Sequence, residues 1–244
     1  MNKITELKQR LVKQASGLVP DESGKPGAEW RSWLGRVCLY REDEGLPTDE
    51  NGDKMLPLAQ ICVEELPYVP EELRGIRYLT LFIERDGRLF DEDFPAENGS
   101  RWLIREYTAE DELVVKELVV DLNDDECLWG WCKPTPLKSF AIEEEYPGGE
   151  TIPGKIFREI IDLEEAGELP DLDEWLPEPD FEVCHIVGGY PISIQGEPEF
   201  KPGYEFVVQI TSNASDDLNI VDNGNLYLAK NRQDGSWQVN YDCF

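Results

Sequence analysis

The stretches Leu58-Ala59-Gln60-Ile61 and Val207-Val208-Gln209-Ile210 decide the fold, because each places a glutamine inside a short apolar run and the same pattern follows both. Downstream, Gly75-Ile76-Arg77-Tyr78-Leu79 matches Gly224-Asn225-Leu226-Tyr227-Leu228. In both copies the glycine follows the glutamine by 15 residues. A strand, a polar loop, a glycine turn and a second strand, repeated in this order, predict an internal duplication.

The repeat extends in both directions from these stretches. Each copy reaches an Asp-Gly pair typical of a hairpin turn, at 86–87 and 234–235. Upstream, Trp33-Leu34-Gly35 loosely mirrors Ile186-Val187-Gly188-Gly189. We therefore predict one domain over residues 1–244, with repeat one at about 30–90 and repeat two at about 183–240. The stretch from about 101 to 175 does not repeat, and we interpret it as a connecting element.

Two segments have helical periodicity. An N-terminal helix is predicted from apolar residues at helical spacing, with Gly17 and Pro20 ending it: Ile4, Leu7, Leu11, Ala15 and Leu18. A second helix is predicted over 153–166, with Pro153 in its first turn and Gly167 after its end. Its apolar stripe contains Ile156, Phe157, Ile160, Ile161 and Leu163.

Most of the remaining chain is predicted to form short strands. Arg77 to Glu84 and Tyr204 to Ile210 are apolar and rich in β-formers, and Trp237, Val239 and Tyr241 alternate as in a half-buried strand. The segment from 112 to 120 fits a strand or a helix, and its valines favour a strand. The predicted fold class is α+β, with a mainly antiparallel sheet built from two sequence-related halves.

Charge restricts the partners. The chain has 23 Lys and Arg against 52 Asp and Glu, which gives a formal net charge of −29. Such a chain repels nucleic acid and anionic membranes, so we expect neither as a partner, whereas a basic protein would be attracted. Solubility alone also explains an acidic composition. The N-terminus has no apolar secretory region, and we expect a cytoplasmic protein with free thiols at its six cysteines.

The first glutamine stretch carries a family resemblance. Pro57-Leu58-Ala59-Gln60-Ile61, followed by Glu65-Leu66-Pro67 and then by Gly75 before an apolar strand, resembles the first motif of the YwqG-like family of unknown function. The resemblance spans about 30–237 and is weakest in the middle. Gly35-Arg36-Val37-Cys38 departs from the family, which more often has a glycine pair and a proline here.

The second motif of that family resembles His185-Ile186-Val187-Gly188-Gly189-Tyr190-Pro191, followed by Gln195, Gln209-Ile210 and Gly224-Asn225-Leu226-Tyr227. The resemblance implies a duplicated α+β fold without an established catalytic activity, and a suspected role as an immunity protein against bacterial toxins. We expect the motif residues to be structural: Gln60, Gly75, His185, Gly188, Gly189, Pro191, Gln195, Gln209 and Gly224.

Catalytic and metal-binding chemistry finds little support in the residues. His185 is the only histidine, which argues against triads and His-based metal sites. Asp49-Glu50-Asn51-Gly52-Asp53 begins like a calcium loop, but Lys54 and Gln60 occupy its two most diagnostic positions. Gly188-Gly189 lacks the residues of a phosphate loop. We predict no catalytic residue, no metal and no cofactor.

Gln60 and Gln209 lie inside apolar strands, where a buried amide has to be hydrogen-bonded, so we expect each to tie its strand to a nearby loop backbone. A role in ligand binding is the alternative for both residues.

Two clusters of carboxylates are candidates for docking a basic partner, although most such groups are simply solvated. The candidates are Asp121, Asp124, Asp125, Glu126, Asp171, Asp173 and Glu174.

Three functions compete. The leading hypothesis is a non-enzymatic immunity-type protein that neutralises a basic toxin by stoichiometric binding, since blocking an active site needs no chemistry. The alternative is an enzyme or small-ligand-binding protein that uses a cleft between the two repeats. A scaffold protein is the third.

Overall fold

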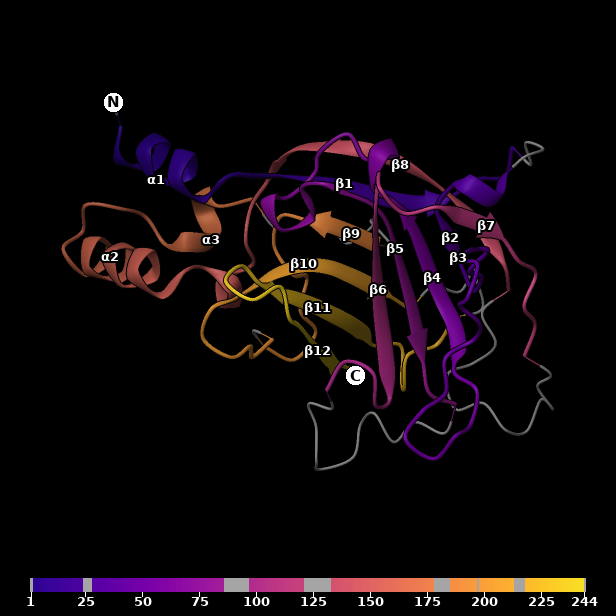
Figure 1. The fold of residues 1–244 in the computed structure, drawn as a ribbon. Coiled ribbons are helices and arrows are strands. Elements are labelled where there is room, and N and C mark those ends of the chain that lie inside the picture. The colour runs from indigo at the N-terminus through magenta and orange to yellow at the C-terminus, as the bar shows by residue number, and fades with distance from the viewer. Residues whose placement is uncertain are drawn as a thin grey trace.

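The computed structural model describes residues 2–23, 28–85, 97–120, 133–177, 185–196, 198–212 and 218–243. Ten of the described strands form one sheet, two form a small separate sheet, and the helices lie beside one end of the large sheet (Figure 1). The helices are α1 (Lys3–Leu11), α2 (Gly154–Glu165) and α3 (Leu172–Trp175), with short 3-10 turns at Ala28–Trp30, Val63–Glu65, Glu71–Leu73 and Gly149–Thr151.

The large sheet has the order β12-β11-β10-β9-β1-β8-β2-β4-β5-β6. All of its neighbouring strands pair antiparallel, which confirms the predicted α+β class with a mainly antiparallel sheet. The strands before β7 are β1 (Lys13–Pro20), β2 (Trp33–Leu34), β3 (Leu39–Arg41), β4 (Leu56–Cys62), β5 (Ile76–Ile83) and β6 (Trp102–Thr108). The others are β7 (Leu113–Val115), β8 (Thr135–Glu145), β9 (His185–Gly188), β10 (Tyr204–Thr211), β11 (Asn225–Asn231) and β12 (Trp237–Asp242).

The sheet has two halves that meet at the β1–β8 pair. We call β8, β2, β4, β5 and β6 the first half, and β1, β9, β10, β11 and β12 the second half. The N-terminal strand β1 thus belongs in space to the second half, and β8, from the middle of the chain, belongs to the first. The non-repeating stretch that we interpreted as a connection therefore supplies two strands of the sheet, β6 and β8.

A matching irregularity lies in both halves. The pairing of β4 with β5 shifts between Pro57 and Ala59, and the pairing of β10 with β11 shifts between Phe206 and Val208, in each case just before the glutamine. The register differs by two residues, however, because Gln60 lies opposite Thr80 whereas Gln209 lies opposite Tyr227. The two halves share this bulge, but the gap-free sequence alignment does not describe the strand pairing, and the duplication stays a prediction.

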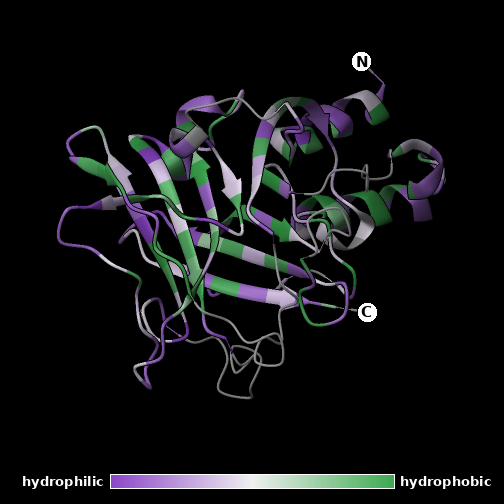
Figure 2. Ribbon diagram, turned by 90° about the vertical axis from the view of Figure 1, so that its right-hand side faces the viewer, coloured by the Kyte–Doolittle hydropathy of each residue, from purple (hydrophilic) through white to green (hydrophobic). Residues whose placement is uncertain are grey.

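The main hydrophobic core lies between the two halves. One continuous cluster contains Leu34, Leu58 and Ile104 of the first half together with Val207 and Leu226 of the second. The sheet therefore curls so that strands β4 to β6 run across strands β10 to β12 (Figure 1). Hydrophobic and polar segments follow one another along these strands (Figure 2), but β4, β5 and β11 are buried at nearly every position, so both of their faces are covered.

Side chains bridge the two edge strands and nearly close the sheet. The carboxylate of Glu106 on β6 accepts a hydrogen bond from the indole nitrogen of Trp237 on β12, at 2.6 Å. The ammonium group of Lys230 on β11 lies 2.6 Å from the same carboxylate. This seam between the halves limits the exposure of unpaired edge strands.

The predicted N-terminal helix is too long. Helix α1 ends at Leu11, since Val12 has an extended backbone, and Ala15 and Leu18 are buried in β1 instead. The apolar spacing did not reveal the change, because β1 lies between β8 and β9 and is buried on both faces, so that Ala15 and Leu18 are covered by two different clusters on opposite sides of the strand. Gly17 lies within that strand, where the ring of Phe140 on β8 covers it. A Cβ atom at position 17 would lie 2.3 Å from the ring.

The three helices form a helical layer with its own small core, which includes Leu7, Leu11, Ile160 and Trp175. The predicted second helix is present as α2. Its apolar stripe is not fully covered, because the Phe157 side chain is 41% exposed.

The other predicted strands are present as β5, β10 and β12. In the ambiguous segment 112–120 only β7 forms, and it pairs with β3. Among the described residues, no helix combines the length and apolar character needed to cross a membrane.

Candidate functional site

Gln60 is a buried structural tie in the first half. Its Oε1 accepts hydrogen bonds from the backbone N–H groups of Cys38 (3.0 Å) and Leu39 (3.1 Å). Its Nε2 donates to the backbone carbonyls of Glu29 (2.8 Å) and Arg31 (2.7 Å). One amide thus satisfies four backbone groups on two loops, as the interpretation of a strand tied to loop backbone expects.

Gln209 has the corresponding position in the second half with fewer bonds. Its Oε1 accepts from the backbone N–H of Ile192 at 2.8 Å, and its Nε2 donates to the hydroxyl of Thr211 at 3.0 Å. The carbonyl of Ile192 accepts from Asn225 Nδ2 (3.0 Å) and from the Tyr227 hydroxyl (2.9 Å). Three side chains in the second half therefore hold the backbone of one residue, Ile192, whereas Gln60 alone holds four.

The Gly188-Gly189-Tyr190-Pro191 turn surrounds a buried carboxylate. Glu145 Oε2, at the end of β8, accepts from the backbone N–H of Tyr190 at 3.0 Å. A Cβ atom on Gly189, whose φ is +69°, would lie only 1.5 Å from that oxygen. The position that resembled a phosphate-binding loop is thus filled by the protein's own carboxylate.

Lys13, a partly exposed residue at the start of β1, completes this turn. The Lys13 ammonium donates to the Gly189 carbonyl at 3.2 Å and lies 3.8 Å from the centre of the Tyr190 ring. Burial raises the pKa of Glu145 to about 7, against the opposing effects of the Tyr190 N–H and of Lys13, and burial lowers the pKa of Lys13. Because the Tyr190 hydroxyl donates to the Leu11 carbonyl at 2.8 Å, the turn also joins the sheet to the helical layer. No local sequence signal indicates the role of Glu145.

The remaining motif residues also have structural positions. His185 is buried at the start of β9 and accepts from the backbone N–H of Thr211 through Nδ1, at 3.2 Å. Gly224 lies against β12, where a Cβ atom would come within 2.0 Å of the Asp242 carbonyl. Gly75 forms the turn before β5, and the backbone N–H of Gln195 faces the Asp242 carboxylate at 3.4 Å.

Reactive or metal-binding groups are scarce in the described part of the chain. Burial raises the pKa of the Cys38 thiol to about 11 and raises that of Cys62, so both thiols stay protonated and unreactive near neutral pH. Cys243 is free and half-buried, while Cys127, Cys132 and Cys184 lie outside the described residues.

The Asp49 loop is closed by its own hydrogen bonds, from the backbone N–H groups of Asn51 and Asp53 to the Asp49 carboxylate. No group of His, Cys, Asp and Glu within the described ranges is arranged to hold a metal ion.

The acidic candidates are divided between described and undescribed residues. Asp121, Asp124, Asp125 and Glu126 lie outside the described residues. Asp171, Asp173 and Glu174 are exposed at the start of α3 in the helical layer, and none of these three carboxylates bonds to another described side chain. From residue 159 to residue 200 the sequence contains no Lys or Arg. The end of α2 and the whole of α3 therefore carry carboxylates without Lys or Arg, whereas α1 and the start of α2 contain Lys3, Lys8, Arg10, Lys155 and Arg158.

An apolar group lies in the same layer. Phe157 is 41% exposed on α2, and half-buried Ile161 lies one helical turn further along. Exposed Asp162 and Glu165 flank this pair. An apolar contact bordered by carboxylates is the composition expected at the centre and rim of a protein-binding surface.

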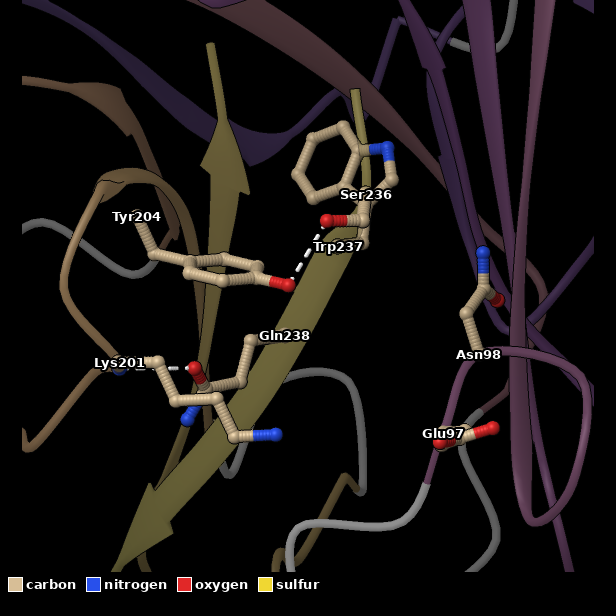
Figure 3. Close-up of a pocket in the computed structure, with 7 residues that line it drawn as sticks. All are labelled: Glu97, Asn98, Lys201, Tyr204, Ser236, Trp237 and Gln238. Atoms are coloured by element: carbon tan, nitrogen blue, oxygen red, sulfur yellow. Dashed lines mark hydrogen bonds between the residues drawn. The ribbon is translucent and has the colours of Figure 1, made fainter. Parts of the chain in front are cut away.

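A cavity of about 310 Å³ opens at the seam between the halves (Figure 3). The second half contributes Lys201, Tyr204, Ser236, Trp237 and Gln238, and the loop before β6 contributes Glu97 and Asn98. The Tyr204 and Ser236 hydroxyls are hydrogen-bonded at 2.7 Å. The alternative hypothesis places a cleft between the two repeats, but the lining residues of this cavity were not predicted, because they come from segments far apart in the chain.

In comparisons with known proteins, no family model matches this chain and no curated protein matches it. The resemblance to the YwqG-like family therefore stays a prediction that rests on the motif residues.

Proposed function

We propose that this protein is a non-enzymatic, cytoplasmic binding protein of the immunity type, which neutralises a basic bacterial toxin by stoichiometric binding through its helical layer. The observation that carries the proposal is the joint exposure of uncompensated carboxylates and an apolar side chain on that layer. Asp171, Asp173 and Glu174 supply negative charge without bonded partners, and Phe157 supplies an apolar contact.

The charge of the whole chain favours a cationic partner. With a net charge of −29, the protein attracts such a partner from any direction, and the end of α2 and α3, which contain no Lys or Arg, direct the last approach. Such charges mainly raise the rate of association, whereas a desolvated apolar contact mainly slows dissociation. The layer combines both contributions.

Binding without catalysis also fits the buried polar groups. The glutamines, the histidine and the Gly-Gly turn of the motifs bond to the protein's own backbone, so these motifs support the fold and leave the surface to recognise the partner. Stoichiometric inhibition requires only that the partner's active site is covered.

The proposal is tested by purifying the tagged protein from its native host at low salt and identifying what accompanies it. We expect a basic protein in a 1:1 ratio, whose toxicity this chain suppresses and whose retention falls as salt rises from 50 to 500 mM. Recovery of no partner, or of a partner that is acidic or bound independently of salt, would contradict the proposal.

A further inference from the structure

We infer that the cavity at the seam between the two halves is a second binding site, which takes a small zwitterion carrying an ammonium and a carboxylate group, such as a free amino acid or a dipeptide. The site is separate from the helical layer, and none of its residues takes part in the proposed toxin binding.

Two opposite charges, Lys201 on one wall and Glu97 on the other, line the cavity. The side chains of Lys201 and Glu97 face each other across the open space (Figure 3), but no ion pair joins them. Neither charged group bonds to another side chain in the described part of the chain. An ammonium and a carboxylate held apart in this way favour a ligand with the opposite arrangement of charges.

Both walls are fixed before any ligand arrives. The Glu97 carbonyl accepts from the backbone N–H (3.0 Å) and hydroxyl (2.8 Å) of Ser100, and the Asn98 side chain accepts from the Ile104 N–H at 2.9 Å. On the other wall, the Lys201 N–H donates to Gln238 Oε1 at 2.9 Å. Because the backbone under each charge is held, little ordering is needed when a ligand binds.

A hydroxyl pair beside the lysine is satisfied within the protein. The Ser236 hydroxyl donates to the Asp234 carboxylate at 2.5 Å, so the Tyr204 hydroxyl donates to Ser236 at 2.7 Å, and Lys201 is the donor left for a ligand carboxylate. The edge of Trp237, held by Glu106, supplies an apolar part of the lining. The ligand carboxylate therefore belongs at Lys201 and the ligand ammonium at Glu97.

Size and net charge narrow the class of ligand. A cavity of about 310 Å³ corresponds to roughly ten waters in volume, which suits a molecule of about ten non-hydrogen atoms. A simple anion would be repelled by Glu97 and by the net charge of −29, and a simple cation would be repelled by Lys201. A small zwitterion avoids both penalties.

The test is a titration of the purified full-length chain with glycylglycine, followed by backbone amide chemical shifts. N-acetylglycine, which lacks the ammonium group, and glycinamide, which lacks the carboxylate, are the matched probes. We expect glycylglycine to bind and each probe to bind at least tenfold more weakly, with shifts at Tyr204, Ser236 and Asn98.

Substitutions of Glu97 and Lys201 test the role of each charge in binding the ligand. Glu97→Gln and Lys201→Met should each weaken glycylglycine binding at least tenfold, while Glu110→Gln, an exposed carboxylate elsewhere, should leave it unchanged. Both positions are exposed, so unaltered melting temperatures verify the fold. The inference is overturned if the wild type shows no shifts at 20 mM glycylglycine, if the singly charged probes bind equally well, or if neither variant weakens binding.

Discussion

The curled sheet and the helical layer use their polar groups in opposite ways. In the sheet, buried polar side chains are directed inward and satisfied by the protein's own backbone, as with Gln60, Gln209 and Glu145. In the helical layer, Asp171, Asp173 and Glu174 face solvent without bonded partners. The motifs shared by the two halves therefore maintain the fold, and we propose that recognition is left to the segment that does not repeat.

The sharpest test on the sheet side is a comparison of the two glutamines. Gln60→Ala leaves four backbone groups without a partner, and we expect it to lower the free energy of unfolding by about 4 kcal/mol. Gln209→Ala removes two bonds and should cost about 2 kcal/mol. Urea denaturation measures both values. Equal losses, or none, would show that the two amides do not support the loops as described.

The next largest loss of stability is expected in the Gly188-Gly189 turn. Gly189→Ala combines a positive φ with a Cβ atom placed on the Glu145 carboxylate, and we expect a loss of about 3 kcal/mol in unfolding free energy. Gly235→Ala is the matched control, because its φ is +73° and its Cβ would meet nothing within 4 Å. It should cost about 1 kcal/mol. A Gly189→Ala variant as stable as this control would refute the role assigned to Glu145.

The same carboxylate makes stability depend on pH. Its pKa is about 7 in the folded protein and is near 4.5 when exposed, so between these values the folded state binds more protons than the unfolded state. Stability contributed by protonated Glu145 is therefore full at low pH and is lost as pH rises from about 4.5 to 7, by up to about 3 kcal/mol.

Glu145→Gln should remove this slope from urea midpoints measured between pH 5 and 7.5, because the amide oxygen can still accept from Tyr190. Glu144→Gln, an exposed neighbour, should retain it. An identical slope in both variants would mean that Glu145 titrates normally.

The smallest effect on stability is expected in the helical layer. The triple variant Asp171→Asn, Asp173→Asn, Glu174→Gln removes no hydrogen bond to a described residue, and thermal denaturation should show a change within about 0.5 kcal/mol. A large loss of stability would mean that these carboxylates stabilise the fold, and it would contradict the contrast between the sheet and the helical layer.

Much of the sheet could be predicted from the sequence, because β-periodicity and the buried glutamines are local signals. The role of Gln60 followed from one rule, that a buried amide must be satisfied. The end of α1 could not be predicted, since Ala15 and Leu18 fit helical spacing although they lie on opposite, equally buried faces of β1. The partnership of Glu145 with Gly189 and the facing of Glu97 and Lys201 depend on contacts distant in sequence, which no local pattern encodes. The exposure of Phe157 depends on where the neighbouring helices end.

The most direct test of the account is the affinity of the co-purified basic partner for two triple variants, measured by calorimetry at 100 mM salt. One variant neutralises Asp171, Asp173 and Glu174 in the helical layer, and the other neutralises the exposed Asp43, Glu110 and Glu112 in the loops next to β3 and β7. Both remove the same net charge. We predict at least a tenfold rise in Kd for the helical-layer variant and less than a twofold rise for the other variant. Equal affinities would contradict it.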